Sequence, residues 1–230
     1  MTDLIWLDNN DFQFPPLDQA LLEPNGLLAA GGDLSPERLI NAYRSGIFPW
    51  FEEDQPILWW SPNPRSVLKP GEIHTSKSLR KTIRKGVFQV TTDQAFEKVI
   101  YQCKDTREYT QGTWITDEMA DAYISLHQLG TAHSVESWID GNLVGGLYGI
   151  AIGRLFFGES MFSTVTDASK VAFEYLAARL NRAGFELIDC QVPNDHLKSL
   201  GSTEISRTKF QDYLEQYLDQ TPNFDPWVND

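Results

Sequence analysis

The dipeptide Asp140-Gly141 constrains the fold of this chain more than any other feature of its sequence. It separates residues 132–139 from residues 142–152, two stretches with the pattern of β-strands, and Asp-Gly is a preferred two-residue turn of a β-hairpin. A strand that follows a helical crossover tends to run parallel to its neighbour. The order of elements therefore predicts an α+β fold in which helices flank a mixed β-sheet. The later elements of this prediction are a strand over 155–160, an amphipathic helix ending near 181, and a strand over 187–192.

The first part of the chain has a different character. Ser35 and Pro36 predict the start of a helix, as N-cap and first helical residue, and Gly46 predicts its end. The aromatic stretch that follows is interrupted by prolines, which favours loops or short strands. We therefore expect a small N-terminal domain over 1–64 and a second domain over 65–230. The order of elements in the second domain fits the plan of acetyltransferase-like (GNAT-type) domains, by analogy of fold alone.

Positive charge is concentrated in one short window of an acidic chain. The formal net charge is −13, yet residues 65–85 contain seven bases and one acid, so this window carries +6 and the remainder carries −19. Such a patch can bind the phosphates of a nucleic acid, and it can equally be the solvated face of a helix. The seven bases are Arg65, Lys69, Lys77, Arg80, Lys81, Arg84 and Lys85.

Several classes of protein are disfavoured by patterns that the sequence lacks. No apolar run approaches the roughly 18 residues of a membrane helix, and the N-terminus has no pattern of a secretory signal. Two cysteines, Cys103 and Cys190, make no disulfide framework and are expected to be reduced and interior. The histidines lack the spacing of a zinc site, and neither a P-loop nor a GxSxG elbow is present. The simplest interpretation is a cytoplasmic protein with structural histidines, no metal and no membrane partner.

The segment 187–192 is the first candidate for a catalytic strand. Alternation places its apolar residues on one face and Asp189 and Gln191 together on the other. Asp189 can polarise Gln191, and the pair can accept a proton from an approaching amine. The alternative is an exposed sheet face that is polar without being functional.

A second candidate is the segment 156–163, where three phenylalanines and Met161 surround Glu159. These side chains can line an apolar pocket with a polar mouth, and the alternative is a buried strand with Glu159 at its exposed end. A coenzyme A site would need a glycine-rich loop at the start of the next helix. Residues 162–169 contain no glycine, and Asp167 would repel an anion. The sequence therefore argues against coenzyme A and indicates no cofactor.

An ordered series of short motifs extends over about residues 14–210. The first are EPNGLLA from Glu23, GGDLSP from Gly31, GIFPWF from Gly46 and ILWWSPNPR from Ile57. The later ones are GTWIT from Gly112, AHSVE from Ala132, LVGGLYG from Leu143, FGESMFS from Phe157 and IDCQV from Ile188, followed by Asn194-Asp-His and Ser199-Leu-Gly. On these motifs the chain resembles the leucyl/phenylalanyl-tRNA–protein transferases of bacteria. Leu147 stands where some members have Met.

The resemblance implies an aminoacyltransferase with an acetyltransferase-like second domain, no metal and no cofactor. Such an enzyme takes Leu or Phe, and less readily Met, from aminoacyl-tRNA. It attaches that residue to the N-terminal Arg or Lys of a protein, which marks the protein for degradation by the N-end rule. The implied partners are Leu-tRNA, Phe-tRNA, and proteins or peptides with those N-termini.

The resemblance also implies roles for individual residues. Asp189 would polarise Gln191, whose amide oxygen takes up the proton of the attacking amine, and Glu159 would position polar groups at the pocket mouth. The implied substrate-binding residues are Trp50, Trp114, Leu147, Phe156, Gly158, Met161, Phe173, Ile188 and Asn194. The implied tRNA-binding residues are Arg65, Lys77, Arg80, Lys81, Arg84 and Lys85.

Two other functions stay open from the sequence. A coenzyme A-dependent acetyltransferase would suit the expected fold and conflicts with the missing glycine-rich loop. A non-catalytic RNA-binding module would suit the basic window and the tryptophans, which can stack on unpaired bases. It leaves Asp189, Gln191 and the pocket motif without a role.

Overall fold

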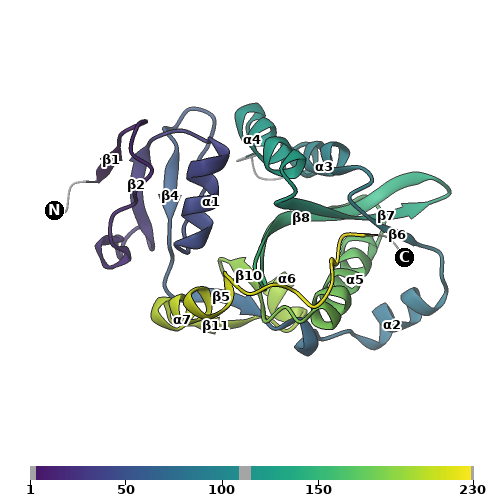
Figure 1. Cartoon of the computed structure of the whole chain (residues 1–230). Coiled ribbons are helices and arrows are strands. Elements are labelled where there is room, and N and C mark those ends of the chain that lie inside the picture. Colours follow the sequence, from purple (N-terminus) through teal and green to yellow (C-terminus); the bar gives the residue numbers. More distant parts are fainter. Residues whose placement is uncertain (1–3, 109–114, 229–230) are drawn as a thin grey trace.

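The computed structural model of the chain describes residues 4–108 and 115–228, which form two β-sheets (Figure 1). The smaller sheet has the order β1-β2-β4-β3, and the larger has the order β11-β5-β10-β9-β8-β7-β6. The strands of the smaller sheet are β1 (Ile5–Leu7), β2 (Leu27–Gly31), β3 (Phe48–Pro49) and β4 (Leu58–Trp60). Those of the larger sheet are β5 (Arg65–Leu68), β6 (Gln89–Thr92), β7 (Ala132–Ile139), β8 (Asn142–Ile152), β9 (Leu155–Ser163), β10 (Leu187–Gln191) and β11 (Thr203–Ile205).

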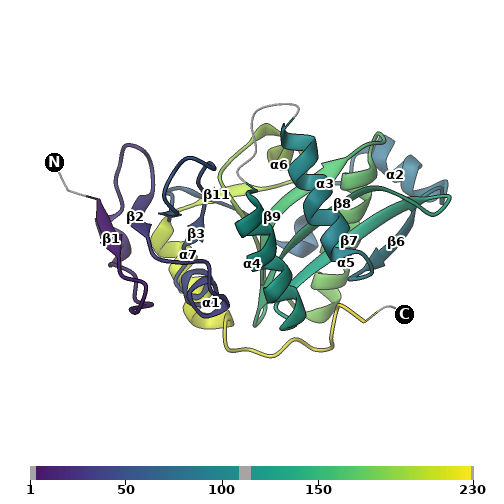
Figure 2. The same ribbon diagram turned by 90° about the horizontal axis from the view of Figure 1, so that it is seen from above.

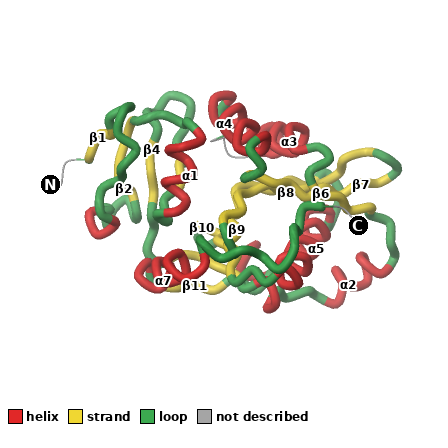
Figure 3. Tube along the Cα trace, viewed as in Figure 1, coloured by secondary structure: helices red, strands yellow, loops and turns green. Residues whose placement is uncertain are grey.

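The larger sheet has the mixed topology that the sequence predicts. β7 and β8 form the hairpin at Asp140-Gly141, with Ile139 opposite Asn142. The helix α5 (Ala168–Ala183) connects β9 to β10, and these two strands run parallel. The pairs on either side of them run antiparallel. An α+β fold with a mixed sheet between helices is therefore confirmed (Figure 3).

Helices cover both faces of the larger sheet (Figures 1 and 2). On one face lie α3 (Phe96–Glu108) and α4 (Asp117–Gln128), and α5 lies on the other. Because both faces are covered, the central strand β8 is buried along most of its length. Other helices of the described part are α1 (Pro36–Arg44), α2 (Lys77–Arg84), α6 (Asp195–Ser199) and α7 (Arg207–Tyr217), with short 3-10 turns at Leu17–Gln19 and Pro70–Glu72.

The helix α1 begins as the sequence predicts. Ser35 Oγ accepts a hydrogen bond from the backbone N–H of Arg38 at 3.4 Å, and Pro36 is the first helical residue. Arg38 is completely buried, and its guanidinium donates to the backbone oxygens of Asp8 and Asp11 at 2.8 and 2.9 Å. A buried guanidinium needs such acceptors, so Arg38 fixes the first segment of the chain to α1.

Two hydrophobic clusters lie on opposite faces of the larger sheet. One joins the N-terminal part to β9, α3, α4 and α7, through residues such as Tyr43, Phe157 and Phe210. The other lies under α5 and includes Phe156 and Phe173. The first cluster therefore extends across residue 64, although the chain passes from the smaller sheet to the larger one between β4 and β5. The domain boundary at residue 64 stays a prediction.

The described residues contain no helix that is long and apolar enough to cross a membrane. Cys103 and Cys190 are both buried thiols and are not joined in a disulfide. The expectation that both cysteines are interior is therefore confirmed.

Candidate active site

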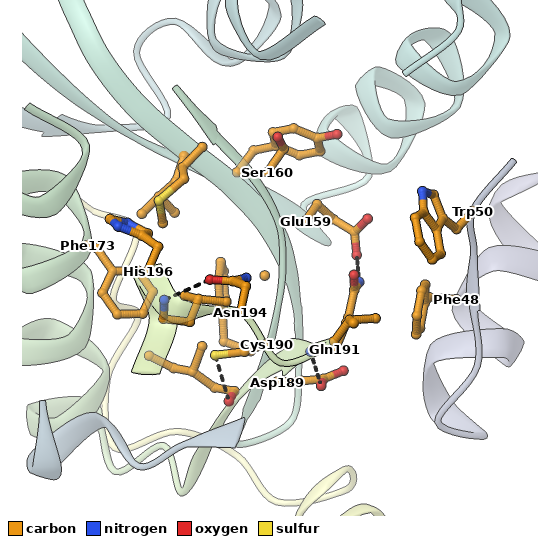
Figure 4. Close-up of a pocket in the computed structure, with 18 of the residues that line it drawn as sticks. Phe48, Trp50, Glu159, Ser160, Phe173, Asp189, Cys190, Gln191, Asn194 and His196 are labelled. Atoms are coloured by element: carbon orange, nitrogen blue, oxygen red, sulfur yellow. Dashed lines mark hydrogen bonds between the residues drawn. The ribbon is translucent and has the colours of Figure 1, made fainter. Parts of the chain in front are cut away.

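A cavity of about 430 Å³ opens between the smaller sheet and the larger one (Figure 4). Trp50 and Phe48 line it from the N-terminal side, and β8, β9, β10 and α5 line it from the other side. Trp114 lies outside the described residues. The sequence-predicted residues that line the cavity are Trp50, Leu147, Phe156, Gly158, Glu159, Met161, Phe173, Ile188, Asp189, Gln191 and Asn194.

A β-bulge in β9 brings the apolar side chains to one face. Tyr148 pairs with Ser160 and Gly149 pairs with Gly158, so Glu159 is the extra residue of the bulge. In a regular strand Phe156 and Met161 would point to opposite faces, because they are five residues apart. The bulge reverses the alternation, so both side chains line the cavity.

A second bulge shapes the end of β10. Asp189 pairs with Val67 and Gln191 with Ser66, which leaves Cys190 unpaired in the ladder with β5. Gln191 has φ of +60°, a conformation that costs a residue other than glycine about 1–3 kcal/mol. Asp189 Oδ1 accepts a hydrogen bond from the backbone N–H of Gln191 at 2.9 Å and so holds this conformation.

The side chains of Glu159 and Gln191 meet at the polar end of the cavity (Figure 4). Gln191 Nε2 donates to Glu159 Oε1 at 2.7 Å. Tyr43 of α1 donates to Oε1 at 2.7 Å, and Tyr123 of α4 donates to Oε2 at 2.8 Å. The two tyrosine oxygens are themselves 2.5 Å apart. Three elements that are distant in sequence therefore orient one carboxyl group and, through it, the Gln191 amide.

The environment of Glu159 changes its proton affinity. Its side chain is buried, and burial raises the pKa to about 8, although hydrogen bonds from Tyr43 and Tyr123 work in the opposite direction. The negative charge of Asp189 raises this pKa further. Burial, together with the nearby Glu159 charge, also raises the pKa of both tyrosines well above the usual value. Glu159 can therefore hold or release a proton near neutral pH, as acid–base chemistry requires.

Asp189 does not have the predicted contact with the Gln191 side chain. It is 2 % exposed, and both of its oxygens accept hydrogen bonds from Arg65, at 2.8 Å from Nε and 2.6 Å from Nη2. The Arg65 guanidinium also lies between the rings of Phe48 and Phe210, 4.8 and 4.7 Å from their centroids. Two predictions are therefore corrected: Asp189 contacts Gln191 through the backbone, and the strand face is not exposed.

The prediction that Arg65 binds tRNA is also corrected. Its side chain is 1 % exposed, pairs with Asp189 and donates from Nη1 to the backbone oxygen of Gly46 at 3.1 Å. A phosphate cannot reach a charge that is buried and paired in this way. By contrast, the other predicted bases Lys77, Arg80, Lys81, Arg84 and Lys85 are exposed on α2 or directly after it.

The predicted site residues did not include Tyr43, Tyr123 or His196, nor the lining residues Tyr148 and Ser160. Nothing in the sequence indicated that Tyr43 and Tyr123 belong to the site. Both lie on the apolar stripes of their helices, where a tyrosine usually packs in the hydrophobic core. His196 also lines the cavity, whereas the sequence predicts a structural role for it. Burial and the charge of Lys170 lower its pKa, which favours the neutral imidazole. Its only sequence signal is its place in the Asn194-Asp-His motif.

Other chemistry at the cavity is disfavoured by the residues present. Burial, and to a lesser degree the Asp189 charge, raises the pKa of the Cys190 thiol, so this cysteine is a poor nucleophile. Within residues 4–108 and 115–228, no group of three or more His, Cys, Asp or Glu side chains is placed to hold a metal ion.

The chain matches one protein family over most of its length. A family model for the leucyl/phenylalanyl-tRNA–protein transferase matches residues 67–215, and a model for the N-terminal domain of the same transferase matches residues 32–63. The chain belongs to this family. The resemblance inferred from the motifs is confirmed, and the chain is an enzyme of the aminoacyltransferase class. Because the chain belongs to this family, the two alternative functions that the sequence left open, a coenzyme A-dependent acetyltransferase and a non-catalytic RNA-binding module, are disfavoured.

Relatives that carry the transferase name are similar over almost the whole chain. The transferase of Pseudomonas fluorescens (strain Pf0-1) is 61% identical and aligns with 98% of this chain and 99% of its own length. The transferase of Stutzerimonas stutzeri (strain A1501) is 59% identical and aligns with 97% of this chain and 99% of its own length. The transferase of Pseudomonas aeruginosa (strain LESB58) is 60% identical and aligns with 96% of this chain and 98% of its own length.

The similarity to solved structures is low. A GCN5-related N-acetyltransferase from Kribbella flavida is 11% identical, with a TM-score of 0.40 over 74% of this chain and 60% of that chain. L-PGS from Bacillus licheniformis is 10% identical, with a TM-score of 0.39 over 69% of this chain and 51% of that chain.

Proposed function

We propose that this transferase moves Leu or Phe, and less readily Met, from aminoacyl-tRNA to the N-terminal Arg or Lys of a protein. The product would be marked for degradation by the N-end rule. The observation that carries this proposal is the cavity itself, in which an apolar end adjoins the hydrogen-bonded pair Glu159–Gln191. An uncharged side chain fits the apolar end, and an ester beside the polar end can meet an amine.

The apolar end would hold the side chain of the transferred residue. Leu147, Phe156, Met161, Phe173 and Ile188 lie around it. A missing or extra methylene in such a pocket changes binding by about 1–3 kcal/mol, so Met is tolerated less well and not rejected.

The mouth would receive the end of the tRNA. Trp50 lines it and is 43% exposed, so one face of its indole is available to stack on the terminal adenosine. Trp114 keeps the same predicted role. Gly158 leaves room beside the ester, and Asn194 lines the cavity while its Oδ1 caps α6 at Leu197 N, 2.8 Å away.

The polar pair would orient the attacking amine. Because Gln191 Nε2 donates to Glu159, the amide oxygen of Gln191 is left to accept a hydrogen bond from the acceptor α-amine. The amine nitrogen bonds to the ester carbonyl carbon, and the bond from that carbon to the ribose 3′-oxygen breaks. An amide is too weak a base to keep the proton, so the proton ends on the leaving 3′-oxygen. Glu159 fixes the amide, and Asp189 fixes the backbone of Gln191.

One assay tests the proposed reaction. Labelled Phe-tRNA is incubated with the enzyme and a peptide that begins with Arg, and the expected result is labelled peptide. The same peptide with an acetylated N-terminus should stay unlabelled, because its amide nitrogen is not a nucleophile. Label transfer from acetyl-CoA, or no label from Phe-tRNA, would contradict the proposal.

The exposed bases of α2 would bind tRNA phosphates. Thr82 Oγ1 donates to Asp167 Oδ2 at 3.0 Å, which fixes α2 to the start of α5, and α5 also supplies Phe173 to the cavity. The acidic remainder of the chain would repel tRNA from other surfaces and attract a cationic N-terminal residue.

Salt dependence tests this tRNA contact. The double variant Lys77→Ala/Lys81→Ala should weaken Phe-tRNA binding, and the slope of log K against log salt should fall by about 1–2. The matched control Lys98→Ala/Lys209→Ala removes two exposed lysines outside α2 and should leave the slope unchanged. Equal effects in both variants would show that α2 is only a solvated face.

A further inference from the structure

The residues after α7 form a strap that returns to the larger sheet. Residues 219–228, here called the C-terminal strap, run past α5 toward β6 and β7 (Figures 1 and 2). Asn223 N donates to Ala183 O at 2.8 Å, and the buried Arg179 of α5 donates from Nε to Pro226 O at 2.8 Å. The strap lies beyond residue 215, where the match to the family model ends, although a named relative aligns with 98% of the chain.

The strap places one large aromatic ring against the sheet. Trp227 stacks on His133 of β7, with ring centroids 4.0 Å apart and an interplanar angle of 4°. His133 is held in turn by Asp93, whose Oδ2 lies 2.7 Å from Nδ1. Thr92 Oγ1 donates to the backbone oxygen of Trp227 at 2.9 Å. Ring and backbone of Trp227 are therefore both fixed.

The other neighbour of Trp227 is a wall of the cavity. Its ring lies 5.8 Å from that of Phe156, which is 1 % exposed and lines the apolar end. On another side Phe156 is bounded by Gly149, where an added Cβ would lie 2.5 Å from Phe156 Cζ. The Phe156 ring is therefore confined by Gly149 and Trp227, and its position limits the depth of the cavity.

We propose that Trp227 is a positioning residue for donor specificity: by supporting Phe156 from behind, it sets the size of the side chain that the cavity accepts. This inference rests on the proposed function, since it concerns the choice between Leu and Phe as donors. Trp227 is not among the residues that line the cavity, so it would act on the donor side chain only through Phe156. Its effect passes through the contact with the Phe156 ring, so a segment near the end of the chain sets the selectivity.

The test is the ratio of kcat/KM for Phe-tRNA to kcat/KM for Leu-tRNA, with one Arg-initiated peptide as acceptor. In Trp227→Ala the Phe156 ring can move into the vacated space and the apolar end deepens. The smaller Leu side chain then loses contacts, and the ratio should rise about tenfold. Loss of folded enzyme lowers both rates equally and leaves the ratio unchanged, so the ratio separates positioning from stability.

Two further variants complete the test. Trp227→Phe keeps a ring between His133 and Phe156 and should return the ratio to near that of the parent enzyme. Val228→Ala changes the neighbouring strap residue, which is 62% exposed, and should not move the ratio. An unchanged ratio in Trp227→Ala, with transfer intact, overturns this inference and leaves the proposed function standing. Absence of transfer by the parent enzyme would instead overturn the proposed function.

Discussion

The two ends of the cavity are built in different ways. The apolar end consists of residues from β8, β9, β10 and α5, all within the second half of the chain. The polar end depends on distant partners: Tyr43 lies 116 residues before Glu159, and Arg65 lies 124 residues before Asp189. In the proposed function, one end would select a side chain by size, and the other holds chemical groups in a fixed orientation. An apolar wall can therefore be built from one part of the chain, whereas the polar arrangement needs both parts.

The two ends of the cavity should also differ in how much free energy a single side-chain substitution costs. An apolar wall loses contact area when a side chain is shortened, and the loss is graded. A buried carboxyl group that loses its partner keeps the full cost of desolvation. Substitutions at the polar end should therefore have larger effects than substitutions at the apolar end.

The largest effect is expected at Glu159. Glu159→Gln keeps the size of the side chain and replaces one carboxyl oxygen by an NH2 group, so the side chain can no longer accept on both atoms from Gln191, Tyr43 and Tyr123, and the Gln191 amide loses its fixed orientation. We expect kcat for Phe transfer to fall about 10²–10⁴-fold with little change in the affinity for Phe-tRNA. Single-turnover transfer and filter binding measure the two quantities. The exposed Glu72→Gln is the matched control, and unchanged turnover in Glu159→Gln would remove Glu159 from the mechanism.

A large loss of stability is expected at Asp189. Asp189→Ala leaves the Arg65 guanidinium buried and unpaired, which should lower the free energy of unfolding by about 3–5 kcal/mol. The double variant Arg65→Met/Asp189→Leu removes both charges and should recover most of that loss. Urea unfolding gives both values. If Asp189 were instead a proton relay, Asp189→Ala would stop transfer while its unfolding midpoint stayed that of the parent enzyme.

A pH-dependent difference in stability should follow from the raised pKa of Glu159. This pKa is about 8 in the folded state and near 4.5 in the unfolded chain, so the folded state binds more protons between these values. Stability is therefore lost as pH rises through this range, by at most about 1.4 kcal/mol per pH unit. The parent enzyme should lose stability relative to Glu159→Gln between pH 5 and 8. Parallel curves for the two proteins would mean that Glu159 is ionised throughout.

Much of the fold was predictable because its signals are local. The Asp140-Gly141 turn defines the hairpin, Ser35 and Pro36 define the start of α1, and the helical crossover defines the parallel pair β9–β10. The apolar lining was predictable only in part, since Phe156 and Met161 line the cavity, whereas Phe157 and Phe162 of the same segment are buried in the other hydrophobic cluster. Each of the features that were predictable depends on neighbours in sequence.

The arrangement of the polar end could not be predicted from the sequence. Alternation along β10 placed Asp189 beside Gln191, but it could not show the bulge between them or that Arg65 binds both carboxylate oxygens. Nor could it show the bulge at Glu159, because a bulge is defined by pairing with the neighbouring strand. Tyr43 reaches Glu159 through tertiary packing alone.

The smallest effect is expected at the apolar end. Met161 is half-buried, and Met161→Ala removes part of the cavity wall without exposing a charge. The change should lower kcat/KM for Leu-tRNA by about 10-fold, and less for Phe-tRNA, because the larger ring still reaches the remaining wall. Leu143→Ala, also half-buried and on β8 outside this cavity, is the control and should leave both values unchanged. A loss at Met161 as large as that in Glu159→Gln, and equal for both donors, would show that the two ends do not act separately.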